Sequence, residues 1–175
     1  MKYIIFLKAI NVGGNRKIKM ADLKVALRSE GYLNITTYIQ SGNIIAEREE
    51  SDHEIIQKEV EALIKKHFGF DVPAVAFNVS EYEEVLKRNP FDGDKLMVHF
   101  LNRIPEQAMI NKLEQLSQDN QDKSAHAGRF LYISLNAGVS DSLFSNKLVE
   151  KVLQVRATAR NWNTVLKMID KANGK

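Results

Sequence analysis

The stretch "NITTYIQSGNIIAE", residues 34–47, decides how the first part of the chain folds. Strand-favouring isoleucine, threonine and tyrosine precede Gln40, Ser41, Gly42 and Asn43, and two further isoleucines follow them. Glycine and asparagine tolerate the positive φ angles that tight turns require. The stretch therefore predicts a β-hairpin that turns at these four residues.

On both sides of the hairpin, the sequence alternates between strand and helix patterns. A short apolar run at residues 3–10 predicts a buried strand, and residues 72–79 predict another. Apolar residues recur at helical spacing from Met20 and stop at Gly31, a residue type that commonly follows a helix. Residues 51–70 show a second helical pattern after an acidic start. The resulting order is β-α-β-β-α-β.

This order is typical of the ferredoxin-like split βαβ fold. We therefore expect an α+β protein whose first domain, residues 1–78, has a four-stranded antiparallel sheet with two helices on one face. Residues 79–175 are expected to form a second, smaller α/β domain with C-terminal helices. The elements predicted there are helices at 80–89, 105–116, 145–153 and 161–172, a strand at 95–101, and a hairpin that turns at Gly128.

The composition excludes several classes of site. The 175-residue chain carries a formal net charge of +3, which by itself is too small to indicate a nucleic-acid-binding protein. Because there is no cysteine, disulfides and thiolate metal sites are excluded. The 4 histidines do not have metal-ligand spacing, so we expect no metal and no other cofactor. No segment is long and apolar enough to cross a bilayer and no signal-peptide cleavage site is evident, so we expect a cytoplasmic protein with no membrane partner.

The segment "AINVGGNRKIKM", residues 9–20, is the strongest indication of a binding site. Arg16 and Lys17 precede a predicted helix start, where acidic and small polar residues are normally preferred. An anion bound by backbone N–H groups around Gly13 and Gly14 would relieve this mismatch. The segment matches neither the P-loop nor the dinucleotide fingerprint. The alternative is that the glycines only let the chain turn while the basic side chains stay solvated.

The predicted topology brings further polar residues to this segment. In a split βαβ sheet, the loop after the first strand and the hairpin turn lie at the same edge, so Gln40, Ser41 and Asn43 should lie beside Asn11. A tight turn selected only for its φ angles explains the same residues equally well.

The last predicted helix begins near Arg160 and Asn163, which either bind an anion at that helix end or connect the two domains. Trp162 is expected to belong to the core, and Thr158 or Asn161 to cap the helix. The candidate ligand-binding residues are therefore Asn11, Gly13, Gly14, Arg16, Lys17, Gln40, Ser41, Asn43, Arg160 and Asn163.

Three segments together resemble a known family. They are "FLKAINVGGNRKIKMADLKVALRSEGY", "TYIQSGNII" and "LFSNKLVEKVLQVRATARNWNTVLKMI". In this order they resemble the bacterial family known as domain of unknown function 1697. The resemblance implies a two-domain α/β protein of ferredoxin-like character and implies no established activity.

Three functions remain open at this point. The first is a binding protein for a phosphorylated small molecule or a nucleic-acid backbone at the basic Gly-Gly segment. The second is an enzyme acting on such a ligand, which Asn11, Arg16, Lys17 and Ser41 would orient. The third is a homodimer or partner-interaction protein without catalysis. Sequence-specific RNA binding is disfavoured, because the predicted strands lack interleaved aromatic and basic residues.

Overall fold

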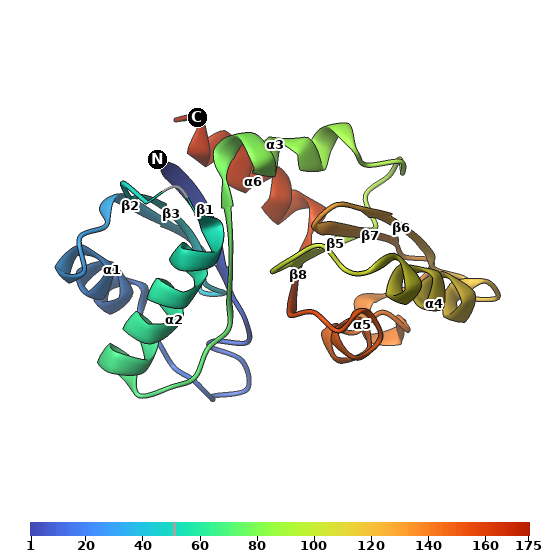
Figure 1. Ribbon diagram of the computed structural model, residues 1–175, viewed down its shortest axis with the longest axis horizontal. Helices are drawn as coiled ribbons and strands as arrows, with labels where there is room; N and C mark the ends of the chain where they lie inside the picture. Colours follow the sequence, from blue (N-terminus) through green and yellow to red (C-terminus); the bar gives the residue numbers. More distant parts are fainter. Residues whose placement is uncertain (51) are drawn as a thin grey trace. The chain divides into compact units, whose positions relative to one another are not determined.

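The computed structural model describes residues 1–50 and 52–175. Within these residues the protein is α+β, with two four-stranded antiparallel sheets and six α-helices (Figure 1). The chain divides into two compact units. The first unit comprises Met1–Glu83 together with Lys167–Lys175, and the second comprises Glu84–Leu166. That residues 1–78 and 79–175 are separate domains stays a prediction.

The first unit contains the predicted β-α-β-β-α-β order, and its strands pair in the order β2-β3-β1-β4. Every neighbouring pair in this sheet is antiparallel. The elements are β1 (Lys2–Leu7), α1 (Met20–Ser29), β2 (Leu33–Tyr38), β3 (Asn43–Glu47), α2 (His53–Phe68) and β4 (Ala74–Asn78).

The central strand β1 is apolar because both of its faces are covered. Tyr3, Ile5 and Leu7 belong to the core that includes residues of α1 and α2, which lie on one face of the sheet (Figure 1). Phe6 lies on the other face, where its ring centroid is 5.7 Å from that of Tyr82. A strand buried on both faces is typically a continuous apolar run, as the sequence indicated.

Helices α1 and α2 follow their predicted patterns. The apolar face of α2 is buried along its length. Its buried apolar residues are Ile56, Val60, Leu63 and Ile64. Asp52 caps the start of α2 by accepting a 2.8 Å hydrogen bond from the backbone N–H of Glu54. Helix α1 is followed by Gly31, whose φ of +87° explains the preference for glycine there.

The second unit repeats this arrangement, with strands in the order β6-β7-β5-β8 and all neighbours antiparallel. Helices α4 and α5 contribute to one core with β5 and β7. The elements are β5 (Leu96–Leu101), α4 (Gln107–Ser117), β6 (Lys123–Ala127), β7 (Phe130–Ser134), the 3-10 helix η1 (Val139–Asp141), α5 (Asn146–Leu153) and β8 (Ala157–Asn161). Strand β8 was not predicted from the sequence.

Two helices contain residues of both units. They are α3 (Val79–Lys87) and α6 (Trp162–Ala172). Of the helices in the described part of the chain, none combines the length and apolar character needed to cross a membrane.

Candidate functional site

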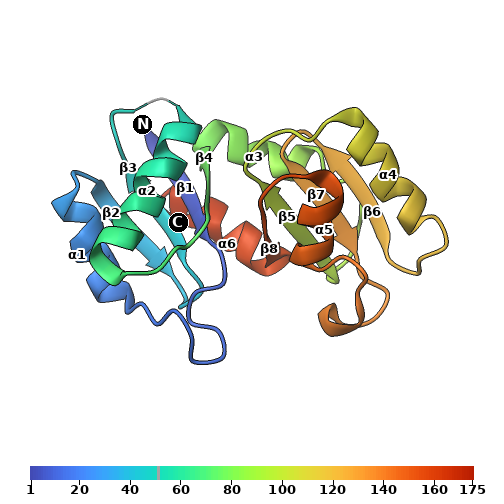
Figure 2. The same ribbon diagram turned by 60° about the horizontal axis from the view of Figure 1, so that its bottom comes forward.

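Three connections of the first unit meet at one edge of its sheet. The backbone N–H of Leu7 donates to the Gly42 carbonyl at 2.8 Å, and that of Lys8 donates to the Pro73 carbonyl at 2.9 Å. The segment between β1 and α1, residues 8–19, is called the basic loop below. Figure 2 shows it projecting beyond the sheet. The prediction that the loop and the hairpin turn lie together is therefore confirmed.

Asn11 holds the basic loop in shape. Its Oδ1 accepts from the Ile18 backbone N–H at 2.8 Å, while its Nδ2 donates to the Ile18 carbonyl at 2.9 Å and to the Gln40 carbonyl at 2.7 Å. Both Nδ2 hydrogens are therefore used within the protein. The Asn11 side chain connects the two ends of the loop to the hairpin turn.

The tip of the basic loop is a tight turn at the surface. Val12 and Asn15 form an isolated antiparallel bridge, and residues 12–17 are all exposed. Gly13 and Gly14 lie between them with φ of +58° and +78°. Glycine reaches these angles without steric cost, so the turn itself explains why two glycines occur here.

Helix α1 begins at the end of this loop without a side-chain cap. Its N-cap residue is Lys19, whose side chain makes no capping hydrogen bond. Arg16, Lys17 and Lys19 are exposed, and Asp22 is the acidic residue in the first helical turn. The uncapped, positively flanked helix start that the sequence indicated is therefore present.

The hairpin turn is held by its own side chains. Asn43 is fully buried, and its Nδ2 donates to the Tyr38 carbonyl at 3.0 Å and to the Ser41 hydroxyl oxygen at 2.9 Å. A Cβ at Gly42 would lie 2.6 Å from the Cβ of Leu7, so only glycine fits where the turn crosses β1. Gln40 is exposed. Asn43 and Ser41 thus have a structural role in the turn, and Gln40 has a side chain open to solvent.

The remaining candidates, Arg160 and Asn163, belong to the second unit. The Arg160 Nη1 donates to the Thr158 hydroxyl oxygen and to the Ala159 carbonyl, both at 2.8 Å, and Asn163 is exposed. Asn161 caps α6 as predicted, since its Oδ1 accepts from the Thr164 backbone N–H at 2.8 Å.

Trp162 is half-buried and lies outside the fully buried core residues, but it is not mostly exposed, so its role in core packing stays a prediction. It is the first residue of α6 and directly follows the edge strand β8, which leaves it at the border of the packed region. Val165 and Met168, which recur at helical spacing along α6, are fully buried instead.

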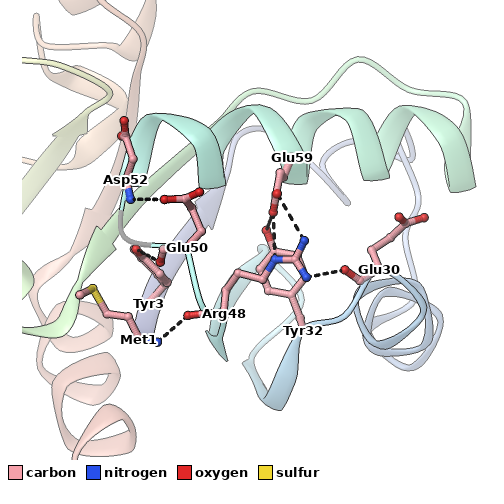
Figure 3. Close-up of polar contacts among 8 residues, drawn as sticks. All are labelled: Met1, Tyr3, Glu30, Tyr32, Arg48, Glu50, Asp52 and Glu59. Atoms are coloured by element: carbon pink, nitrogen blue, oxygen red, sulfur yellow. Dashed lines mark hydrogen bonds and ion pairs between the residues drawn. The ribbon is translucent and has the colours of Figure 1, made fainter.

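A polar cluster that the sequence did not indicate lies around Arg48 (Figure 3). The Arg48 guanidinium pairs with Glu59, with an Nε–Oε2 distance of 3.2 Å, and its Nη1 donates to the Glu30 carbonyl at 2.8 Å. It also lies 5.0 Å from the centroid of the Tyr32 ring, and the Tyr32 hydroxyl donates to Glu59 at 3.0 Å. Burial, followed by the nearby Glu59 charge, raises the pKa of Tyr32.

Two pockets, of about 550 Å³ and about 220 Å³, share Arg48 and Glu59 as lining residues. A Cβ at Gly31 would lie 2.5 Å from the Arg48 Nη1, so the glycine makes room for the guanidinium. Arg48 therefore connects the end of α1 to β3 and α2, which is a structural role.

Across residues 1–50 and 52–175, no three histidine, aspartate or glutamate side chains come together as metal ligands.

Comparisons with known proteins agree with this picture of a fold without an assigned reaction. The family model described as "Protein of unknown function (DUF1697)" matches residues 1–132. The solved structure of the conserved bacterial protein SP0830 from Streptococcus pneumoniae is similar, with 21% sequence identity, a TM-score of 0.70, and 98% of each chain covered. At this identity the similarity shows the fold alone. A search of curated proteins finds no match. Because the family model covers most of the chain, this protein belongs to the family described as protein of unknown function DUF1697.

Proposed function

We propose that this protein binds a phosphate-bearing ligand at the basic loop. The observation that carries the proposal is the start of α1, which lacks a side-chain cap and is preceded by exposed Arg16, Lys17 and Lys19. A helix N-terminus presents unsatisfied N–H groups and a partial positive charge, so it attracts anions. Three cations beside it disfavour the free state and favour an anion-bound one.

The contacts around the loop support this assignment. Within the described residues, Arg16, Lys17 and Lys19 form no salt bridge with an acidic side chain, whereas Lys65 and Lys66 of α2 each do. Cations at a surface without an acidic partner remain available to a ligand. A phosphate accepts several charge-assisted hydrogen bonds at once through its separate oxygens.

Each candidate residue has a distinct part in the proposal. Gly13 and Gly14 supply backbone N–H groups, and Arg16 and Lys17 supply charge. The exposed Gln40 belongs to the neighbouring hairpin turn, where its backbone carbonyl accepts from the Asn11 side chain. The other residues of this edge have supporting parts: Asn11, Ser41 and Asn43 keep the loop and the turn in place through their hydrogen bonds. Arg160 and Asn163 stay candidate ligand residues of the second unit.

The test is a titration of wild type and the double variant Arg16→Ala/Lys17→Ala with inorganic phosphate, a nucleotide and a single-stranded RNA. Because two charge-assisted contacts are removed, we expect affinity to fall by about tenfold or more. We also expect wild-type binding to weaken as salt increases, since exposed charges are screened over about 8 Å at physiological ionic strength.

A matched control is Lys147→Ala/Lys151→Ala, which removes two exposed cations from α5. This variant should bind as wild type does. Equal loss in both double variants would mean nonspecific attraction to net charge, and equal binding by the wild type and the loop variant would remove the site.

We also propose that the first unit is a ferredoxin-like domain. The β-α-β-β-α-β order, the antiparallel strand order β2-β3-β1-β4 and the packing of α1 and α2 against one sheet face support it. In that fold, a long loop after the first strand is not required to close the sheet, so its length here is available for binding.

A further inference from the structure

The second unit contains a buried histidine that the proposed function does not use. His99 lies on β5 and is 2% exposed, and its Nδ1 is 3.0 Å from the Asn146 Oδ1 at the start of α5. Burial lowers the pKa of His99 to about 4, although its bonds to Asn146 and the Phe144 backbone act in the opposite direction. His99 is therefore neutral at pH 7.

Residues 136–145, which lie between β7 and α5, are called the strap below. It contains only the short 3-10 helix η1, and residues 136–141 are all exposed. The buried Asp122 carboxylate holds it by accepting from the Asn136 backbone N–H at 2.8 Å and from the Ser142 hydroxyl at 2.6 Å. Phe144 is the buried apolar residue near its end.

The strap forms one wall of a small cavity of about 160 Å³. His99 lies on the wall made by the sheet, and the start of α5 closes the side between the two walls. The lining residues are Val139, Ser142, Phe144 and Ser145 of the strap, Met97, His99, Ile133, Leu135 and Ala159 of the sheet side, and Asn146 of α5. The strap therefore covers one side of the cavity that His99 lines.

We propose that the strap is an acid-released lid, which leaves the sheet and opens the cavity when His99 becomes protonated. An imidazolium in a largely apolar wall has lost its hydration, and this cost disappears once the strap moves away. Opening the strap breaks its two hydrogen bonds to Asp122 and exposes Phe144. By contrast, β5 is paired with both β7 and β8 along its length.

The charged groups near His99 do not compensate for its burial. Glu150 of α5 raises the pKa of His99, but less than burial lowers it. Lys147 and Lys151 of the same helix are exposed. On β8, Arg160 donates to groups of its own strand, and β7 contributes no charged residue. On the strap side, the titratable groups are the buried Asp122 carboxylate and the exposed Asp141 of the strap itself.

The test is amide hydrogen exchange of the whole protein at pH 7 and pH 5, corrected for the intrinsic exchange rate. With a pKa of 6.5 in the open state and about 4 in the closed state, the opening constant of the strap should rise about twentyfold between pH 7 and pH 5. The opening constant measured at the amides of β5 should rise clearly less. The variant His99→Gln should abolish the rise. The control variant His126→Gln replaces a half-buried histidine on β6 and should leave the rise unchanged.

Several results overturn the proposal. The first is an opening constant of the strap that is the same at pH 5 as at pH 7, and the second is an equal rise of the opening constant along β5. The third is a strap whose opening no longer depends on pH in Asp122→Asn but still depends on pH in His99→Gln. If His99→Gln does not fold, NMR titration of the wild-type His99 ring replaces it. The lid is supported if, on acidification, the opening constant of the strap starts to rise near pH 6.5 and levels off near the titration midpoint of the His99 ring. It is rejected if the opening constant follows the titration of another group.

Discussion

The two units repeat the same order of strands and helices, but they lengthen different connections. In the first unit the chain uses residues 8–19 to pass from β1 to α1, whereas in the second it passes from β5 to α4 in residues 102–106. The long connection of the second unit is the strap, which precedes α5. The shared sheet order shows that neither long segment is needed to build the fold. We therefore expect each long segment to serve a role other than folding.

The helix starts sharpen the comparison. Neither α1 nor α4 has a side-chain cap, but the N-cap residue is Lys19 in α1 and Glu106 in α4. A missing cap alone therefore does not distinguish the two units. The difference is the charge beside the helix end, which attracts an anion at α1 and repels one at α4.

The largest effect is expected where the two β-hairpins differ. In Gly42→Ala the new Cβ would lie 2.6 Å from the Leu7 Cβ at a φ of +78°, whereas in Gly128→Ala the nearest atom is the flexible Arg88 Nη1 at 3.5 Å. We expect Gly42→Ala to lower the free energy of unfolding by about 3 kcal/mol or more and Gly128→Ala by about 1 kcal/mol. Urea denaturation of both variants measures this. Equal losses would mean that the turn of the first unit is not held against β1.

A smaller effect is expected at the end of α1. Gly31→Ala brings a Cβ to 2.5 Å from the Arg48 Nη1, while Gly69→Ala at the end of α2 meets no atom within 4 Å at a similar φ of +79°. We expect losses of about 2 and about 1 kcal/mol in the free energy of unfolding.

A double-mutant cycle with Arg48→Ala isolates the contact, because removing the guanidinium should make Gly31→Ala as mild as Gly69→Ala. A coupling energy near zero would show that Arg48 does not need the space at Gly31.

The smallest effect is a gain. Lys19→Asp places a capping side chain at an N-cap with a φ of −72° and a ψ of 134°, so we expect it to stabilise the protein by about 1 kcal/mol. Lys17→Asp makes the same charge change in the exposed loop and should alter stability by less than about 0.5 kcal/mol. Thermal unfolding of both variants measures the difference, and a destabilised Lys19→Asp would mean that this helix start is not free to accept a cap.

The sequence predicted the parts of the fold whose residues form a repeating pattern. The apolar run of β1, the buried face of α2 and the turn at Gly42 all follow from residues that are close in the chain. Strand β8 was missed because its residues, Ala-Thr-Ala-Arg-Asn, include no bulky apolar side chain and run directly into the helical pattern of α6. Its pairing with β5 determines its conformation instead.

The candidate site was predicted only in part, for a related reason. The basic loop is one continuous segment, so its charge and its glycines could be seen directly. The cluster of Tyr32, Arg48 and Glu59 joins residues from separate elements, and Arg48 stands in an acidic stretch that resembles a solvated loop. Only the pairing of β2 with β3 and the packing of α2 bring these side chains together.

The division of the chain has a consequence for its synthesis on the ribosome. The first unit includes Lys167–Lys175, which are translated after all of Glu84–Leu166. In this late segment, Ala172 accepts a 2.8 Å hydrogen bond from the Lys2 Nζ, and the Lys171 Nζ lies 5.7 Å from the centroid of the Tyr38 ring. The unit that leaves the ribosome first is thus completed last, and a nascent chain that stops before Lys167 lacks both contacts.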